Sequence, residues 1–236
     1  MELSVVVPVH NEADNVAPLI AEIAAALDGR LDYEIVYVDD GSADGTVAAL
    51  HALKATRPRL RVVRHAARCG QSAAIRTGVA AARAPWIATL DGDGQNDPAD
   101  IPSLWALRSG HNAAQMIAGQ RTKRRDSWSK RISSRWANRI RARLLGDDTP
   151  DTGCGLKLFP RALYLELPNF DHMHRFLGAL MIRQGATIQS VPVNHRPRVR
   201  GTSKYGFWDR LWVGIVDLLG VMWLQRRAKI PRSDEV

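Results

Sequence analysis

Short apolar segments alternate with segments of helical periodicity along the first half of the chain. Strands are predicted where β-branched and other apolar residues run together between polar turns: Leu3–His10, Tyr33–Val38, Leu60–Arg64, Trp86–Leu90 and Met116–Gly119. Helices are predicted where apolar residues recur every three or four positions or follow a capping residue: Asp14–Leu27, Ser42–Ala55, Gln71–Arg83 and Pro98–Leu107. This alternation predicts an α/β fold in which helices cover both faces of a mostly parallel sheet.

The second half of the chain is patterned differently and predicts amphipathic helices. Apolar residues recur at every fourth position from Trp128 to Leu144, and basic residues crowd the other faces of that predicted helix. Such a helix fits a bilayer interface, and it also fits a helix packed on the core with a solvated basic face. Residues 153–200 are predicted as a loop, a helix and the strand Thr187–Val193. The apolar run Leu211–Leu224 is shorter than the roughly 20 residues of a membrane-spanning helix, so a buried or interfacial helix is predicted there, followed by Arg226, Arg227 and Lys229.

The net charge of +9 is distributed unevenly along the chain. Residues 1–100 carry 14 acidic and 9 basic side chains, a net charge of −5, so the rest of the chain carries +14. A basic half beside an acidic half indicates an anionic partner, which is nucleic acid, anionic lipid or a phosphorylated substrate. The two cysteines, Cys69 and Cys154, lack the spacing of a disulfide framework or a zinc site. Because the chain begins with a strand rather than a basic, apolar leader, a cytosolic protein is expected.

Carboxylates follow three of the predicted strands, in the segments Pro8–Glu12, Val38–Asp44 and Asp91–Gln95. In an open α/β sheet, ligands bind outside the carboxyl ends of the strands. Asp91 and Asp93 are two residues apart and Gln95 follows them, so this segment offers hard oxygen ligands suited to Mg²⁺ or Mn²⁺. An isolated Asp-x-Asp is more often a solvated turn, but three acidic strand ends in one sheet indicate a metal–nucleotide site.

Together with three segments of the second half, these motifs resemble the family 2 glycosyltransferases, and within them the polyprenyl-phosphate (dolichyl-phosphate mannose synthase-like) branch. The additional segments are Asp151–Lys157, His174–Phe176 and Asn194–Tyr205. The resemblance implies a GT-A (Rossmann-like) fold with C-terminal amphipathic helices. It divides the chain into a nucleotide-sugar-binding half (1–121), an acceptor-side half of the same domain (122–206) and a C-terminal interfacial helix with a basic tail (207–236).

The resemblance also implies how the donor substrate and its metal ion are held. Mg²⁺ or Mn²⁺ would be bound by Asp91, Asp93 and Gln95, with Asp93 taking part in catalysis. The residues implied in nucleotide-sugar binding are Pro8, His10 (where the family often has tyrosine), Glu12, Val38, Asp40, Asp91, Gly92, Arg121 and Lys157. Other readings stay open at three of these positions: Glu12 also suits a helix cap, Asp40 an Asx turn and Arg121 a solvated basic run.

Basic residues around Gly201 are the strongest signal for the acceptor substrate. The implied phosphate-binding residues are Arg175, Arg196, Arg198, Ser203 and Lys204, of which Arg198 and Lys204 are also implied in catalysis. Arginine binds phosphate through a planar fork, and lysine adds a point charge. A nucleic-acid-binding module is the alternative from another class, but the run lacks the interleaved aromatic residues of a stacking platform, so no nucleic-acid partner is expected.

The nature of the nucleophile separates the two enzymatic hypotheses. A sugar hydroxyl needs a general base, whereas a phosphate monoester, with a second pKa of about 6, is already a nucleophile at neutral pH. Where hydroxyl-directed relatives present an acidic pair, this chain has Asp171 followed by His172, His174 and Arg175. The main prediction is an inverting transfer from a UDP- or GDP-linked sugar to a polyprenyl phosphate, by a peripheral enzyme on an anionic membrane at its cytosolic face. Transfer to a glycan or glycolipid hydroxyl is the alternative, and the need for an integral membrane partner is left open.

Overall fold

The computed structural model describes residues 1–110, 114–121, 141–197 and 207–227, and of residues 207–213 it describes only the helical backbone. Strands and helices alternate through the first half: β1 (Leu3–Val9), α1 (Ala13–Leu27), β2 (Tyr33–Asp39), α2 (Thr46–Lys54), β3 (Leu60–Arg64), α3 (Gln71–Ala81), β4 (Trp86–Thr89), the short turn η1 (Pro98–Asp100), α4 (Ile101–Ala106) and β5 (Gln115–Arg121). The second half contributes β6 (Lys157–Pro160), α6 (Arg161–Leu165), η2 (Met173–Phe176), α7 (Leu177–Arg183), β7 (Thr187–Val193) and α8 (Phe207–Arg227).

The described strands form one seven-stranded sheet in the order β3-β2-β1-β4-β6-β5-β7. Every neighbouring pair is parallel except the two pairs made by β6, which runs antiparallel to β4 and β5. The predicted mostly parallel sheet is therefore confirmed. Strand β6 is not among the predicted strands, because its four residues are too few to show the pattern of apolar and polar positions that indicates a strand. The sheet continues across the division predicted at residue 121, since β6 and β7 extend it on the far side of β4.

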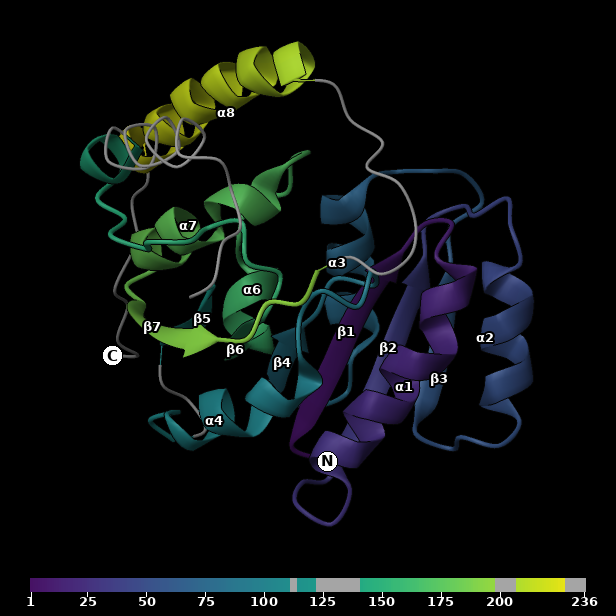
Figure 1. Cartoon of the computed structure of the whole chain (residues 1–236). Coiled ribbons are helices and arrows are strands. Elements are labelled where there is room, and N and C mark those ends of the chain that lie inside the picture. The colour runs from purple at the N-terminus through teal and green to yellow at the C-terminus, as the bar shows by residue number, and fades with distance from the viewer. Residues whose placement is uncertain (111–113, 122–140, 198–206, 228–236) are drawn as a thin grey trace, which may run out of the picture.

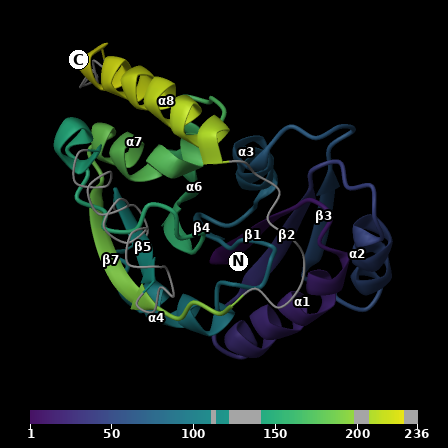
Figure 2. The same ribbon diagram turned by 45° about the horizontal axis from the view of Figure 1, so that its top comes forward.

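Alternate residues of the strands face two separate layers of core. On one face, Val5 and Val7 of β1 pack with α1, α2 and α4. On the other face, Val6 of β1 and Val36 of β2 pack with α3, α6 and α7. Figures 1 and 2 show the helices on opposite sides of the sheet, with α8 lying over α7 on the α3 side. Burial on both faces explains why the strands read as continuous apolar runs rather than as alternating ones.

Most predicted elements lie within a few residues of their observed bounds. The strands at Leu60–Arg64 and Thr187–Val193 are confirmed residue for residue. The predicted helix over 98–107 is a short turn followed by α4. The predicted helix beginning near Trp128 lies largely outside the described residues, but residues 141–145 are helical.

The last described helix, α8, is longer than the predicted run Leu211–Leu224 and has two apolar faces. Val221 is buried against the core, with Leu218 and Met222 packed beside it. A second set of apolar side chains on the helix is exposed: Ile215, Val216, Leu219 and Trp223. No described helix is both long and apolar enough to cross a bilayer.

Candidate active site

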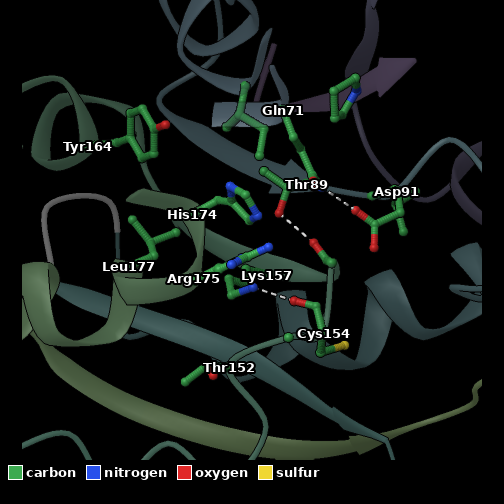
Figure 3. Close-up of a pocket in the computed structure, with 15 residues that line it drawn as sticks. Gln71, Thr89, Asp91, Thr152, Cys154, Lys157, Tyr164, His174, Arg175 and Leu177 are labelled. Atoms are coloured by element: carbon green, nitrogen blue, oxygen red, sulfur yellow. Dashed lines mark hydrogen bonds between the residues drawn. The ribbon is translucent and has the colours of Figure 1, made fainter. Parts of the chain in front are cut away.

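The ends of three strands meet at one edge of the sheet and frame a pocket of about 300 Å³ (Figure 3). The carboxyl ends of β1 and β4 contribute Pro8, Leu90 and Asp91, while Lys157 stands at the start of antiparallel β6. Because β6 runs backwards, its first residue reaches the same edge as the last residues of its neighbours. The opposite wall comes from α3, α6 and the turn η2, which supply Gln71, Ile75, Tyr164, His174 and Arg175.

The carboxylate of Asp91 lies at the rim of this pocket. Its Oδ1 accepts a hydrogen bond of 2.8 Å from the Gln71 side chain, and Figure 3 shows this bond. Burial and, to a smaller extent, the negative charge of Asp93 together raise the pKa of Asp91 to about 6. The positive charges of Lys157 and Arg121 act in the opposite direction. Two carboxylates that repel one another in a partly buried position form a site whose charge a divalent cation would neutralise.

Gly155 allows the backbone of the second half to lie directly against Asp91. A Cβ atom at Gly155 would lie 2.2 Å from Asp91 Oδ2 and 2.7 Å from Asn96 Oδ1, closer than atoms can approach. Gly92 makes a similar close contact on the other side, where a Cβ would lie 2.3 Å from the Val9 side chain. The Asp91 turn is thus held between the end of β1 and the segment that precedes β6.

Two further cations lie near Asp91. The side chain of Lys157 is buried and donates a short hydrogen bond to the Cys154 carbonyl oxygen. Burial lowers the pKa of Lys157, while nearby Asp91 and Asp151 raise it. Arg121 donates two hydrogen bonds, of 2.6 and 2.7 Å, to the Asp151 carboxylate in a bidentate pair. Both residues, which are predicted to bind the nucleotide sugar, therefore have protein partners that position them near Asp91.

The predicted nucleoside-binding residues surround the ends of β1 and β2. Asp40 accepts hydrogen bonds from the Cys69 and Gly70 amides at 2.7 and 2.8 Å, and its Oδ1 lies 2.8 Å from His65 Nδ1. This carboxylate therefore organises the loop that leads into α3. His10 Nδ1 lies 2.9 Å from the Asp40 carbonyl oxygen.

Two other predicted nucleoside-binding residues take part in local packing. The side chain of Glu12 accepts a hydrogen bond from Asn15. Val38 is fully buried in the core on the α3 side, so only its backbone is placed to reach a ligand. The roles of these residues in binding a nucleotide sugar stay predictions.

Asp40, His65 and Cys69 also bring three metal-ligating atoms within 4.8 Å of one another. Both ring nitrogens of His65 already have partners, because Nε2 lies 2.9 Å from Thr77 Oγ1. The Asp40 carboxylate likewise receives two backbone amides. The three atoms lie close together because the Asp40 carboxylate binds the backbone of the loop that carries Cys69.

The segment after β7 lies against the turn Asp91–Gln95, where the metal site is predicted and which is called the metal turn below. Asn96 and His195 form an isolated antiparallel bridge, and the Gln95 side chain donates to the Arg196 carbonyl oxygen at 3.4 Å. The Arg196 guanidinium pairs with Glu22 and Asp97, each at 2.7 Å. Arg196 therefore anchors this segment to α1. The other predicted residues of the segment, Arg198, Ser203 and Lys204, lie outside the described residues.

Several residues that shape the site are not among those predicted from the sequence. Gln71 and Ser72 begin α3 and contact Asp91 and His174, respectively. Asp151 and Gly155 lie in a segment that the resemblance had marked, but their roles as the Arg121 partner and as the close contact of Asp91 had no local signal. Among the predicted acceptor residues, Arg175 lines the pocket.

The residues at the metal turn fit Mg²⁺ or Mn²⁺. Asp91 and Asp93 supply carboxylate oxygens, the ligands that both ions accept. Burial is the main cause of the raised pKa of Asp91, and the negative charge of Asp93 adds to it, so a cation bound here would relieve part of the shift. Asp93 Oδ1 accepts a hydrogen bond of 3.1 Å from the backbone amide of Gln95, which holds Gln95 beside the two carboxylates.

The comparisons with known proteins agree on one family. A family model described as "Glycosyl transferase family 2" matches residues 4–167. A dodecaprenyl-phosphate galacturonate synthase of Rhizobium johnstonii is 37% identical over 236 residues, which cover 98% of this chain and 69% of that protein. An undecaprenyl-phosphate 4-deoxy-4-formamido-L-arabinose transferase of Edwardsiella ictaluri is 34% identical, over 86% of this chain and 63% of that protein. The chain thus spans about two thirds of the length of these relatives.

Solved structures share the fold at lower sequence identity. Glucosyl-3-phosphoglycerate synthase from Mycobacterium tuberculosis, in complex with Mg²⁺ and uridine diphosphate, matches with a TM-score of 0.68 at 20% identity. The match covers 95% of this chain and 79% of that one. The same enzyme with Mn²⁺, UDP-glucose and glycerol 3-phosphate matches with a TM-score of 0.66. The predicted GT-A fold is confirmed by this likeness.

Proposed function

The chain belongs to glycosyl transferase family 2, and we propose that it moves a sugar from a nucleotide sugar to a polyprenyl phosphate with inversion at the anomeric carbon. Both relatives named above are enzymes whose names specify a polyprenyl phosphate. The family match supports the transferase chemistry, and the names support the acceptor. The sugar and the nucleotide base are not part of the proposal.

The observation that carries the proposal is the charge of the pocket lining. Among the described lining residues, Asp91 is the single carboxylate, and it belongs to the metal turn. Asp171, the candidate general base of the alternative hypothesis, is exposed and does not line the pocket. The remaining polar groups include Lys157, His174 and Arg175. A pocket without a base but with several donors suits a nucleophile that is already anionic, which a phosphate monoester is at neutral pH.

Each side of the pocket has a distinct part in this reaction. Asp91 and Asp93 would hold the ion, which supplies Lewis-acid assistance to the leaving nucleoside diphosphate. Lys157 adds a buried positive charge behind them, and the pair with Asp151 fixes the direction of Arg121. Arg175 lies on the opposite wall and would bind the incoming phosphate through its planar fork. The acceptor phosphate oxygen would then attack the anomeric carbon from the side opposite to the leaving nucleoside diphosphate, as a single displacement requires.

We also propose that the protein works on an anionic membrane at its cytosolic face. The exposed residues of α8 form an apolar stripe, with Leu219 and Trp223 each 60% exposed. Arg226 and Arg227 follow at the end of the helix and are exposed as well. An interfacial helix has this combination of an apolar face and flanking basic residues. Figure 2 shows α8 on the outside of α7, away from the sheet.

The test is the chemistry of the product together with two variants. Wild-type protein is incubated with radiolabelled UDP- and GDP-sugars and undecaprenyl phosphate, and label is followed into the organic phase. A glycosyl phosphate releases its sugar in mild acid, whereas a glycoside formed on a hydroxyl does not. Asp171→Asn should cost less than about tenfold in rate, because no base is used. Arg175→Ala should cost more, because a charge-assisted hydrogen bond contributes about 1.5–3 kcal/mol.

Arg83→Ala is the matched control, since Arg83 is exposed and lies outside the pocket. It should leave the rate unchanged. An acid-stable product, or a collapse of activity in Asp171→Asn beside a mild effect in Arg175→Ala, would instead support transfer to a hydroxyl.

A further inference from the structure

A buried serine, Ser72, contacts both the backbone and the side chain of His174 in the pocket wall. The Ser72 hydroxyl oxygen lies 3.2 Å from the His174 backbone nitrogen, from which it accepts a hydrogen bond. The same oxygen lies 2.7 Å from His174 Nδ1. Ser72 is only 1% exposed, and His174 Nδ1 lies within hydrogen-bond distance to accept its proton. With the Ser72 proton donated to Nδ1, the ring proton of a neutral His174 would be on Nε2.

The surroundings of His174 keep the ring neutral. Burial and, to a smaller extent, the positive charges of Lys157 and Arg175 together lower the pKa of His174 to about 3. A protonated His174 would be a third cation beside Lys157 and Arg175, and their positive charges would repel it. A neutral ring keeps a hydrogen-bond donor in the pocket without adding a charge.

His174 lies in the middle of the pocket wall in Figure 3, with Arg175 and Lys157 below it. A donor fixed on Nε2 cannot accept a proton at that atom, so His174 is not a general base in this state. His174, Arg175 and Lys157 all carry N–H groups, so this part of the lining suits a negatively charged oxygen of a ligand. Asp91, the negative group of the lining, is at the rim and is contacted by Gln71, the residue before Ser72. The first turn of α3 thus contacts both the metal carboxylate and the histidine.

We propose that Ser72 locks His174 as a neutral Nε2–H donor, and that this donor binds an oxygen of the acceptor phosphate. Ser72 is then a positioning residue and His174 a binding residue, beside the arginine fork of Arg175. The inference rests on the proposed function for the identity of the ligand. The state of His174 itself does not depend on that function.

The first experiment measures the ring directly in the wild-type protein without substrate. Histidine is labelled with ¹⁵N, the His174 signals are assigned by comparison with His174→Gln, and the nitrogen shifts are followed by NMR from pH 5 to 8. Nε2 should carry the proton, Nδ1 should not, and neither shift should titrate, since the pKa lies far below this range. In Ser72→Ala the ring loses its Nδ1 partner, so the signals should move or begin to titrate. A wild-type ring protonated on Nδ1, or one that titrates near pH 6.5, would overturn the inference.

The second experiment separates acceptor binding from donor binding by steady-state kinetics with each substrate varied. His174→Phe removes the donor while keeping a ring, and should raise the KM for polyprenyl phosphate or lower kcat/KM for it by about 10- to 100-fold, as for a hydrogen bond to a charged group. The KM for the nucleotide sugar should change less than threefold. His174→Gln keeps an amide donor of similar reach and should recover part of the loss.

His51→Ala, a change of an exposed histidine on α2, is the control and should match the wild type. An effect of His174→Phe confined to the KM of the nucleotide sugar would overturn the assignment to the acceptor phosphate. The two proposals also fail differently. An acid-stable wild-type product defeats the proposed function, whereas an acid-labile product with unchanged acceptor kinetics in His174→Phe defeats only this inference.

Discussion

Replacing Gly155 with alanine tests whether the position of the Asp91 carboxylate controls metal binding. The new Cβ would lie 2.2 Å from Asp91 Oδ2 and 2.4 Å from its Cγ. Non-bonded carbon atoms approach to about 3.5 Å, so the carboxylate must retreat by about 1 Å. Metal–ligand distances tolerate only about 0.2 Å. Gly155→Ala should therefore weaken Mn²⁺ binding and turnover by about 100-fold, and overpacking should cost about 1–3 kcal/mol of stability.

Mn²⁺ affinity is measured by titration calorimetry, turnover by transfer of radiolabel, and stability by thermal melting. Gly220→Ala is the control, because nothing lies within 4 Å of a Cβ at that position of α8. It should bind Mn²⁺ as the wild type does. A Gly155→Ala protein that binds Mn²⁺ within twofold of the wild type and keeps its full rate would refute the reasoning, because the carboxylate could then move without consequence.

Three further predictions follow from charges and exposed surfaces. The raised pKa of Asp91 means that protons compete with the metal below pH 6, so calorimetry should show Mn²⁺ affinity falling by about tenfold per pH unit there and no fall between pH 7 and 8. Arg121→Met should destabilise the protein by about 3–5 kcal/mol in urea unfolding, because it removes the guanidinium that pairs with the buried Asp151 carboxylate. The double change with Asp151→Leu should regain most of this loss, and a double variant as unstable as the single one would contradict the explanation. Leu219→Glu with Trp223→Glu, both at exposed positions, should reduce sedimentation with phosphatidylglycerol vesicles by at least about tenfold without changing the melting temperature; unchanged sedimentation would exclude α8 as the contact.

Much of the fold and part of the site follow from the sequence, because their signals are local. Periodicity within a window of residues predicted the strands at Leu60–Arg64 and Thr187–Val193 with their observed bounds. The placing of Pro8 and Asp91 at one pocket was also predictable, since the carboxyl ends of parallel strands share an edge. The family resemblance supplied the rest of the expected chemistry, and the segment holding Arg198 and Lys204 stays a prediction.

Other features were decided only by tertiary structure. Strand β6 is short and has no periodic signal, and it forms because β4 and β5 leave a gap between them that Lys157–Pro160 fills. Ser72 and His174 are 102 positions apart in sequence, yet they share two hydrogen bonds. The contact of Gly155 with Asp91 likewise exists only once the two halves of the sheet have joined. A pattern along the chain encodes the period and the facing of each element, whereas a hydrogen bond between distant segments depends on the path of the whole backbone.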